Sequence, residues 1–162
     1  MNNPRTRMPA EPDDVTFASL LLSSHLRLLG EPLCPRERIS PREAADWLYA
    51  QAPFGLLAHD TAADPRFVYA NITAQERFGY SWNEFLGLPS RLSARPDAQQ
   101  DRDALVREVT ANHYATGYRG VRVAKDGRLF WIEDVTMWDL IDAQGTSHGQ
   151  AAVFRSSSEA GT

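Results

Sequence analysis

Side chains that could take part in chemistry are spread along this sequence and form none of the familiar catalytic patterns. There is no Gly-x-Ser-x-Gly nucleophile motif, no glycine-rich phosphate-binding loop and no His-Glu-x-x-His zinc motif. Glu133 and Asp134 are adjacent acids in a predicted strand. Because neighbouring strand residues point to opposite faces, these two carboxylates cannot act together as acid and base. The residues therefore favour binding over catalysis.

Histidine and cysteine give no support for a metal site. His59 lies in an aspartate-rich turn, and His25 and His148 have no partner at a ligand spacing. His113 closes a predicted helix, where its charge suits the helix dipole. Cys34 is the single cysteine, so an internal disulfide and a zinc site built on several thiolates are both excluded. We expect no bound metal.

The composition is that of one soluble domain with an extension. The 162 residues are 43% hydrophobic and 23% charged, with a formal net charge of −4. Lys125 is the only lysine and no basic run exceeds two residues, which argues against a nucleic-acid partner. The longest aliphatic run, Leu20–Leu22, is far too short to span a membrane, and residues 1–14 lack the apolar segment of a signal peptide. We expect a cytoplasmic protein.

Local patterns predict an α+β fold. Asp14 could cap a helix that ends at Gly30, and Ser40 with Glu43 forms a capping box for the next helix. A group of short helices lies between two sets of strands, which indicates an antiparallel sheet with helices packed on one face. The predicted helices are 14–29, 41–51, 72–79, 81–87 and 97–112, and the predicted strands are 54–60, 66–70, 116–124, 128–141 and 147–155.

Several motifs, in this order along the chain, resemble a known family. Phe67-Val-Tyr-Ala-Asn71, Phe78-Gly-Tyr-Ser81, Glu84-Phe-Leu-Gly87 and the hairpin Lys125-Asp-Gly-Arg-Leu-Phe-Trp131 resemble the signature of PAS domains. More narrowly, His59-Asp-Thr-Ala-Ala-Asp-Pro65, Leu88-Pro-Ser-Arg-Leu-Ser93 and Tyr118-Arg-Gly-Val-Arg-Val123 resemble the MEKHLA domain, which is related to PAS. The resemblance covers about residues 40–155. It implies a PAS-like five-stranded antiparallel sheet with short helices on one face, preceded by N-terminal helices.

On this basis the chain divides into four parts. We expect a disordered arm over 1–12, an N-terminal helical extension over 13–52, a PAS-like MEKHLA domain over 53–156 and a disordered tail over 157–162.

The resemblance also bears on cofactors. Light-oxygen-voltage PAS domains bond a flavin through a cysteine, and the similar segment here, Gly87-Leu-Pro-Ser90-Arg91, has a serine in its place. A hydroxyl cannot replace a thiolate in that adduct, and Cys34 lies outside the core, so flavin–cysteinyl chemistry is excluded. PAS haem sensors use a histidine on the long helix, where this chain offers His113, and haem is not favoured. No cofactor is assigned.

If the hairpin aligns with those of other PAS domains, alternation divides its side chains between two faces. Arg122 and Asp134 would then lie inward on adjacent strands. A buried charge needs a partner, so they would form either a structural ion pair or an anchor for an anionic or polar ligand. The inward residues would be Tyr118, Gly120, Arg122, Phe130, Ile132, Asp134, Thr136 and Trp138. The residues expected to bind a ligand are Arg122, Asp134, Thr136, Tyr118, Ile132, Trp138, Ser90, Arg91 and Phe154.

The opposite face of the hairpin is predicted to be apolar and to need a cover. The helices 14–29 and 41–51 are the obvious cover, either from the same chain or swapped from a second subunit. Dimerisation through this face is therefore expected. The outward residues would be Val121, Val123, Trp131, Val135 and Met137.

The resemblance implies a sensory module, not an enzyme, that binds an unidentified small molecule. Its signal would leave through the N-terminal helices, in a homodimer or toward a signalling partner. Two alternatives stay open. One is a small hydrolase or lyase that uses Arg122 and Asp134, and the other is a structural interaction domain with a filled core.

Overall fold

The fold is that of a computed structural model, in which residues 11–35 and 38–160 are described. Most of the predicted arm, residues 1–10, and the last two residues of the predicted tail lie outside the described residues. In chain order the elements are α1 (Val15–Leu29), α2 (Pro41–Asp46), the π-helical turn η1 (Trp47–Gln51), β1 (Gly55–His59), β2 (Phe67–Ala70), α3 (Ile72–Phe78), α4 (Trp82–Phe85), the 3₁₀ turns η2 (Ser90–Ser93) and η3 (Pro96–Ala98), α5 (Gln99–Asn112), β3 (Tyr114–Val123), β4 (Leu129–Ile141) and β5 (Ser147–Glu159).

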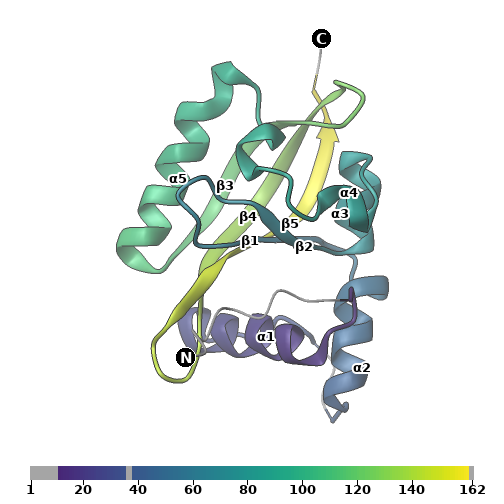
Figure 1. Cartoon of the computed structure of the whole chain (residues 1–162), viewed down its shortest axis with the longest axis vertical. Coiled ribbons are helices and arrows are strands. Elements are labelled where there is room, and N and C mark those ends of the chain that lie inside the picture. Colours follow the sequence, from purple (N-terminus) through teal and green to yellow (C-terminus); the bar gives the residue numbers. More distant parts are fainter. Residues whose placement is uncertain (1–10, 36–37, 161–162) are drawn as a thin grey trace.

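The five strands form one antiparallel sheet in the order β2-β1-β5-β4-β3. Figure 1 shows α1 and α2 gathered at one end of the molecule, apart from α3, α4 and α5. This arrangement confirms the predicted α+β fold, with a five-stranded antiparallel sheet, short helices and a leading pair of helices.

The helix ends follow the capping residues in the sequence. The Asp14 carboxylate accepts a hydrogen bond from the Phe17 amide at 2.9 Å, and Gly30 ends α1 in the left-handed conformation at φ +75. At α2, Ser40 and Glu43 make both hydrogen bonds of a capping box. Both ends of α1 and the start of α2 therefore lie where the sequence predicts them.

The turn η1 joins the leading helices to the sheet. The Ala52 amide donates to the Trp47 carbonyl at 2.8 Å, one residue further back than in an α-helix. Pro53 has no amide hydrogen, so it cannot donate to the Leu48 carbonyl. The Asn71 side chain donates to that carbonyl instead, at 3.0 Å. A residue that follows β2 thereby fixes the end of the extension.

The last strand is longer than expected. We predicted an end near residue 155, but β5 continues to Glu159 because β4 is also long and gives it pairing partners. Ser157 pairs with Ile132, and Glu159 pairs with Phe130. Residues 157–159, assigned from the sequence to the tail, thus lie in the sheet.

The side-chain alternation of β4 breaks at Asp134. This residue has a left-handed backbone, φ +51, and the β3–β4 pairing is irregular around Tyr118. Such a bulge moves each later side chain to the other face of the sheet. Val135 and Met137 consequently lie on the inner face, where they line a cavity, and not on the outer face as predicted.

Three inward predictions are wrong for the same reason. Asp134 is exposed, Thr136 pairs with Val153 of the outer core, and Trp138 packs in that outer core against α1. Upstream of the bulge the predicted alternation holds, since Phe130, Ile132 and Arg122 lie on the inner face.

Two apolar layers lie on the two faces of the sheet. The outer layer joins α1, α2 and η1 to the sheet, and its fully buried members include Leu21, Leu48 and Trp138. The inner layer joins α3 and α4 to the sheet around Phe78 and Phe130, whose rings meet edge to face with centroids 4.9 Å apart. The leading helices therefore cover, within the same chain, the part of the outer face around Leu56, Trp138 and Val153, whereas Val121, Val123 and Trp131 are half-buried and lie outside this layer.

Candidate ligand-binding site

A cavity of about 60 Å³ lies on the inner face of the sheet, between the strands, α5 and η2. Its wall is mainly apolar, with a few polar side chains among the apolar ones. The lining residues come from all five strands and from the helical segments: Leu57, Ala58, His59, Phe67, Ser90, Ser93, Arg102, Leu105, Val106, Arg122, Ile132, Val135, Met137, Gln150, Ala152 and Phe154.

Arg122 reaches the cavity from β3. Its side chain is buried, with 6% of the residue exposed. Nη1 donates to the Val121 carbonyl at 2.9 Å and makes a long contact of 3.4 Å with the Tyr118 hydroxyl. Gly120 lies between them, and a Cβ there would clash with the Tyr118 ring. Among the described residues Arg122 has no ion-pair partner, so its charge is met by neutral acceptors alone.

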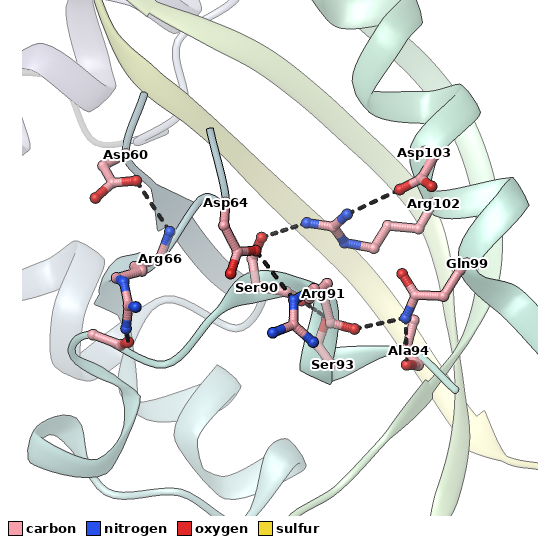
Figure 2. A network of polar contacts seen from close by, with 11 residues as sticks. Asp60, Asp64, Arg66, Ser90, Arg91, Ser93, Ala94, Gln99, Arg102 and Asp103 are labelled. Carbon is pink, nitrogen blue, oxygen red and sulfur yellow. Dashed lines mark hydrogen bonds and ion pairs between the residues drawn. The ribbon is translucent and has the colours of Figure 1, made fainter. Parts of the chain in front are cut away.

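Arg102 reaches the same cavity from α5 and is 9% exposed. Figure 2 shows its guanidinium between two partners: Nη2 donates to the Ser90 hydroxyl, and Nη1 donates to the Asp103 carboxylate at 3.2 Å. Burial lowers the pKa of Arg102 and the nearby Arg122 lowers it further, while Asp103 raises it. The two guanidinium groups therefore repel one another across the site.

The turn η2 holds Ser90 in place through its own polar contacts (Figure 2). The Ser90 amide donates to the Pro65 carbonyl at 2.8 Å. The Ser93 hydroxyl donates to the Ser90 carbonyl at 2.7 Å. From α5, the side-chain Nε2 of Gln99 donates to the backbone carbonyls of Arg91 and Ala94, each at 2.7 Å. Ser90 is thus a fixed part of the wall.

A chain of buried hydrogen bonds leads from the cavity to the surface. His59 Nε2 lies 3.1 Å from Gln150 Oε1, and Gln150 Nε2 donates to Asp139 Oδ1 at 3.2 Å. Asp139 Oδ2 lies 2.9 Å from Nδ1 of His113, which is half exposed. Because the Gln150 oxygen can only accept, His59 Nε2 must carry the proton. Burial lowers the pKa of His59 to about 4, so its imidazole is neutral at pH 7.

The structure brings together only some of the residues that the sequence proposed for ligand binding. Arg122, Ile132, Ser90 and Phe154 line the cavity. Tyr118 lies beside it and touches Arg122.

The other four do not line the cavity. Arg91 is exposed and pairs with Asp64 at 3.2 Å. Asp134 lies at the bulge and is exposed, and Thr136 and Trp138 lie beyond the bulge on the other side of the sheet. The proposed ion pair between Arg122 and Asp134 therefore does not form.

Sequence reasoning missed Arg102, His59, Gln150 and Ser93, which all line the cavity. For Arg102 a sign was present. It lies three and seven residues before the apolar Leu105 and Val109 in the predicted helix 97–112, so helical periodicity places all three side chains on one face. For the others the sequence carries no comparable sign.

A flavin or a haem does not fit this cavity. Pockets for ligands of that size are roughly 300–1,000 Å³, whereas the volume here is about 60 Å³. The ring of Phe154, a residue of the cavity wall, packs so closely on Gly55 that even a Cβ there would clash, so no space for a larger ligand lies between these two residues. Ser90, at the position of the flavin-bonding cysteine in light-oxygen-voltage domains, lines the cavity with a hydroxyl and not with a thiol. In the described ranges no three His, Cys, Asp or Glu side chains lie together as a metal site would need.

Comparison with solved structures finds PAS and light-oxygen-voltage domains. The PAS domain of a protein from Colwellia psychrerythraea shares 16% identity over 67% of this chain and 87% of that chain, with a TM-score of 0.56. The light-oxygen-voltage domain of the blue-light photoreceptor Aureochrome1 shares 20% over 66% and 75%, with a TM-score of 0.53. An RNA-binding light-oxygen-voltage receptor shares 20% over 80% of this chain and 36% of that chain, with a TM-score of 0.62. At these identities the likeness shows the fold.

The family comparison reaches further than the fold. No curated protein matches the chain. The family model of the MEKHLA domain, in contrast, matches residues 15–158, which include α1, the cavity and nearly all of β5. The chain therefore belongs to the MEKHLA domain family, with a fold like that of the PAS and light-oxygen-voltage sensory domains.

Proposed function

We propose that this protein is a sensory module that holds a small molecule in the inner cavity and signals through α1 and α2. The observation that carries the proposal is the cavity itself. Apolar residues make most of its wall, and two buried arginines and one serine hydroxyl converge on it. A small apolar hollow with a few convergent polar groups is the usual form of a ligand site.

The route of the signal follows the strands that separate the cavity from α1. Met137 and Ala152 line the cavity, while their chain neighbours Trp138 and Val153 pack in the outer layer. A shift of β4 or β5 on ligand binding would therefore change the surface on which α1 rests. We infer that ligand binding alters the packing of the leading helices, which act on a second copy or on a partner protein.

Other functions have less support. The enzyme that would use Arg122 with Asp134 lacks its pair, because Asp134 is exposed at the bulge and does not line the cavity. A purely structural domain with a filled core would leave no role for two buried arginines beside a cavity. One structural neighbour binds RNA, but the net charge of −4 here argues against the same partner.

The proposal also includes the cellular location of the protein. None of the helices in the described ranges is both long and apolar enough to cross a membrane. The single cysteine is compatible with a reducing compartment, and we infer that the module works in the cytoplasm.

Native mass spectrometry of the protein purified from its own host tests the proposal. We expect a bound small molecule that is lost in Ala152→Leu, because the larger side chain fills the cavity. Ala111→Leu is the matched control, since Ala111 is exposed on α5. Wild-type protein without any bound mass, and with no metabolite that stabilises it, would contradict ligand binding.

A further inference from the structure

The polar groups that face the cavity are unbalanced in charge. Its lining contains two arginines, Arg102 and Arg122, and neither an aspartate nor a glutamate. His59 is neutral and its ring N–H is engaged by Gln150, so it adds no negative charge. The hydroxyl of Ser90 accepts from Arg102 and keeps its own hydrogen for another acceptor. The charged groups that face the cavity, the two guanidinium groups, are thus both hydrogen-bond donors.

The protein compensates these two charges only in part. Arg102 shares the carboxylate of Asp103, whose side chain is half exposed to solvent. Arg122 meets one carbonyl and one hydroxyl oxygen. A guanidinium stays protonated in proteins, and a buried charge without a counter-charge is costly. The missing counter-charge is therefore expected from outside the chain.

We propose that the ligand is a small monocarboxylate with a short apolar tail, such as propionate, held by Arg122 and Arg102. The inference rests on the proposed ligand-binding function and adds the chemical class. The carboxylate would bond to the two guanidinium groups and the Ser90 hydroxyl. Its tail would face the apolar wall, which includes Ile132, Val135 and Met137.

Size and polarity select this class among anions. A cavity of about 60 Å³ has room for about four to six water-sized groups at roughly 10–15 Å³ each. Acetate and propionate fit this space, whereas dicarboxylates with longer chains do not. Inorganic phosphate is also small enough, but it would set oxygen atoms against the apolar wall without hydrogen-bond partners. A five-atom ligand reaches a dissociation constant no tighter than a few micromolar.

The test measures binding of sodium propionate to the full chain by calorimetry, with sodium chloride at equal ionic strength as the salt control and sodium phosphate as a second arm. We expect propionate to bind wild type in the micromolar to millimolar range and phosphate to bind at least tenfold more weakly. Equal or tighter phosphate binding would overturn the carboxylate assignment.

Three arginine variants locate the site. Arg122→Met and Arg102→Met should each weaken propionate binding at least tenfold, because each removes one guanidinium. Arg107→Met is the matched control, since Arg107 is exposed on the same helix as Arg102. Propionate affinity that is equal in all three variants would remove the cavity arginines from the site.

Resonances of the arginine side chains in the wild-type protein report propionate binding directly, so this test does not depend on whether the variants fold. In wild type, the Nε–H resonances of the two buried arginines should shift on propionate addition, while that of Arg107 should not. We also expect Arg122→Met to be at least as stable as wild type without ligand, because it removes an uncompensated buried charge. A large loss of stability in Arg122→Met would contradict that expectation.

Different experimental results would show that the carboxylate assignment is wrong and that the ligand-binding function is wrong. If a neutral molecule co-purifies with wild type and is lost in Ala152→Leu, the cavity is a ligand site and the carboxylate is wrong. If neither propionate nor any co-purified mass responds to Ala152→Leu, the ligand-binding function itself is wrong.

Discussion

Met137 and Trp138 are neighbours in β4, yet their side chains lie in different layers of the protein. Met137 lines the inner cavity, and Trp138 is fully buried against α1, where its indole N–H donates to the Ser24 hydroxyl at 2.9 Å. The Trp138 and His25 rings also meet edge to face, with centroids 4.9 Å apart. A ligand that displaces Met137 thus acts on a strand whose next residue is bonded to α1.

The bond between Trp138 and Ser24 should contribute measurably to stability. Ser24→Ala leaves the buried indole N–H unpaired and is expected to lower the free energy of unfolding by about 1–3 kcal/mol. Urea denaturation measures the change, and Ser19→Ala, at an exposed position of the same helix, should have little effect. If both variants unfold at the same urea concentration as wild type, the bond does not stabilise the packing of α1.

Coupling between the cavity and α1 is also open to measurement. Saturating propionate should slow amide hydrogen exchange in α1 by a factor of about two to ten, because a fixed β4 holds its packing surface still. In Ser24→Ala the same ligand should protect α1 less. Protection confined to the cavity wall, with none in α1, would contradict the proposed signal route.

The bulge at Asp134 should be sensitive to residues that avoid a left-handed backbone. Asp134→Gly is expected to keep or raise the free energy of unfolding, by up to about 1 kcal/mol, and Asp134→Val to lower it by about 1–2 kcal/mol. Urea denaturation gives both values. Asp134→Gly should bind propionate as wild type does, since the carboxylate is exposed and does not line the cavity. A large loss of binding in that variant would return Asp134 to the site.

Asn71 joins the leading helices to the sheet through four hydrogen bonds. Its Nδ2 donates to the carbonyls of Leu48 and Phe54, and its Oδ1 accepts from the amides of Leu56 and Ala74, all between 2.9 and 3.0 Å. Asn71→Asp would set a carboxylate oxygen against two carbonyls and should lower the free energy of unfolding by about 3 kcal/mol or more at pH 7.

The deficit of Asn71→Asp should shrink in acid, because a protonated carboxyl can donate to one of the two carbonyls. Urea denaturation at pH 4 and pH 7 makes the comparison. Asn83→Asp is the control, since Asn83 is exposed in α4. A deficit that is equal at both pH values would contradict this account of the Asn71 contacts.

His59 should make stability fall in mildly acidic solution. Burial lowers its pKa from 6.5 to about 4, so below pH 6.5 the unfolded chain takes up a proton that the folded protein does not. Stability is unaffected above pH 6.5 and falls as pH drops toward 4, by about 3 kcal/mol in total. Urea denaturation of His59→Gln over this range should show a flatter dependence.

The remaining slope in His59→Gln has a second source. Burial also lowers the pKa of His25, which acts in the same direction, so the variant should lose only part of the pH dependence. A slope that matches wild type throughout would show that His59 is not buried as described.

The fold could be predicted because its signals are local. The caps at Asp14 and Ser40, the left-handed Gly30 and the turn at Asp126 and Gly127 each fix a boundary through a few adjacent residues. These boundaries, in order, leave few arrangements other than helices packed on an antiparallel sheet.

The site could be predicted only up to the bulge. Strict alternation places Arg122 and Ile132 correctly, but nothing in the sequence around Glu133 and Asp134 indicates a left-handed residue in the middle of a strand. One such residue exchanges the faces of Met137 and Trp138. The cavity volume depends on how side chains from seven segments fit together, which periodicity does not describe.

The turn η1 sets how the leading helices can move. The Leu48 carbonyl, which accepts no backbone hydrogen bond from Pro53, accepts one from the Asn71 side chain, so the end of the extension at η1 is fixed to the domain. The helix α1, in contrast, packs against Trp138. The proposed rearrangement of α1 would then leave residues 47–52 bonded to the domain and would not require the extension to detach. A shortened chain that begins at residue 53 would lose both residues 47–52 and the cover, and would leave Trp138 and Leu140 in water.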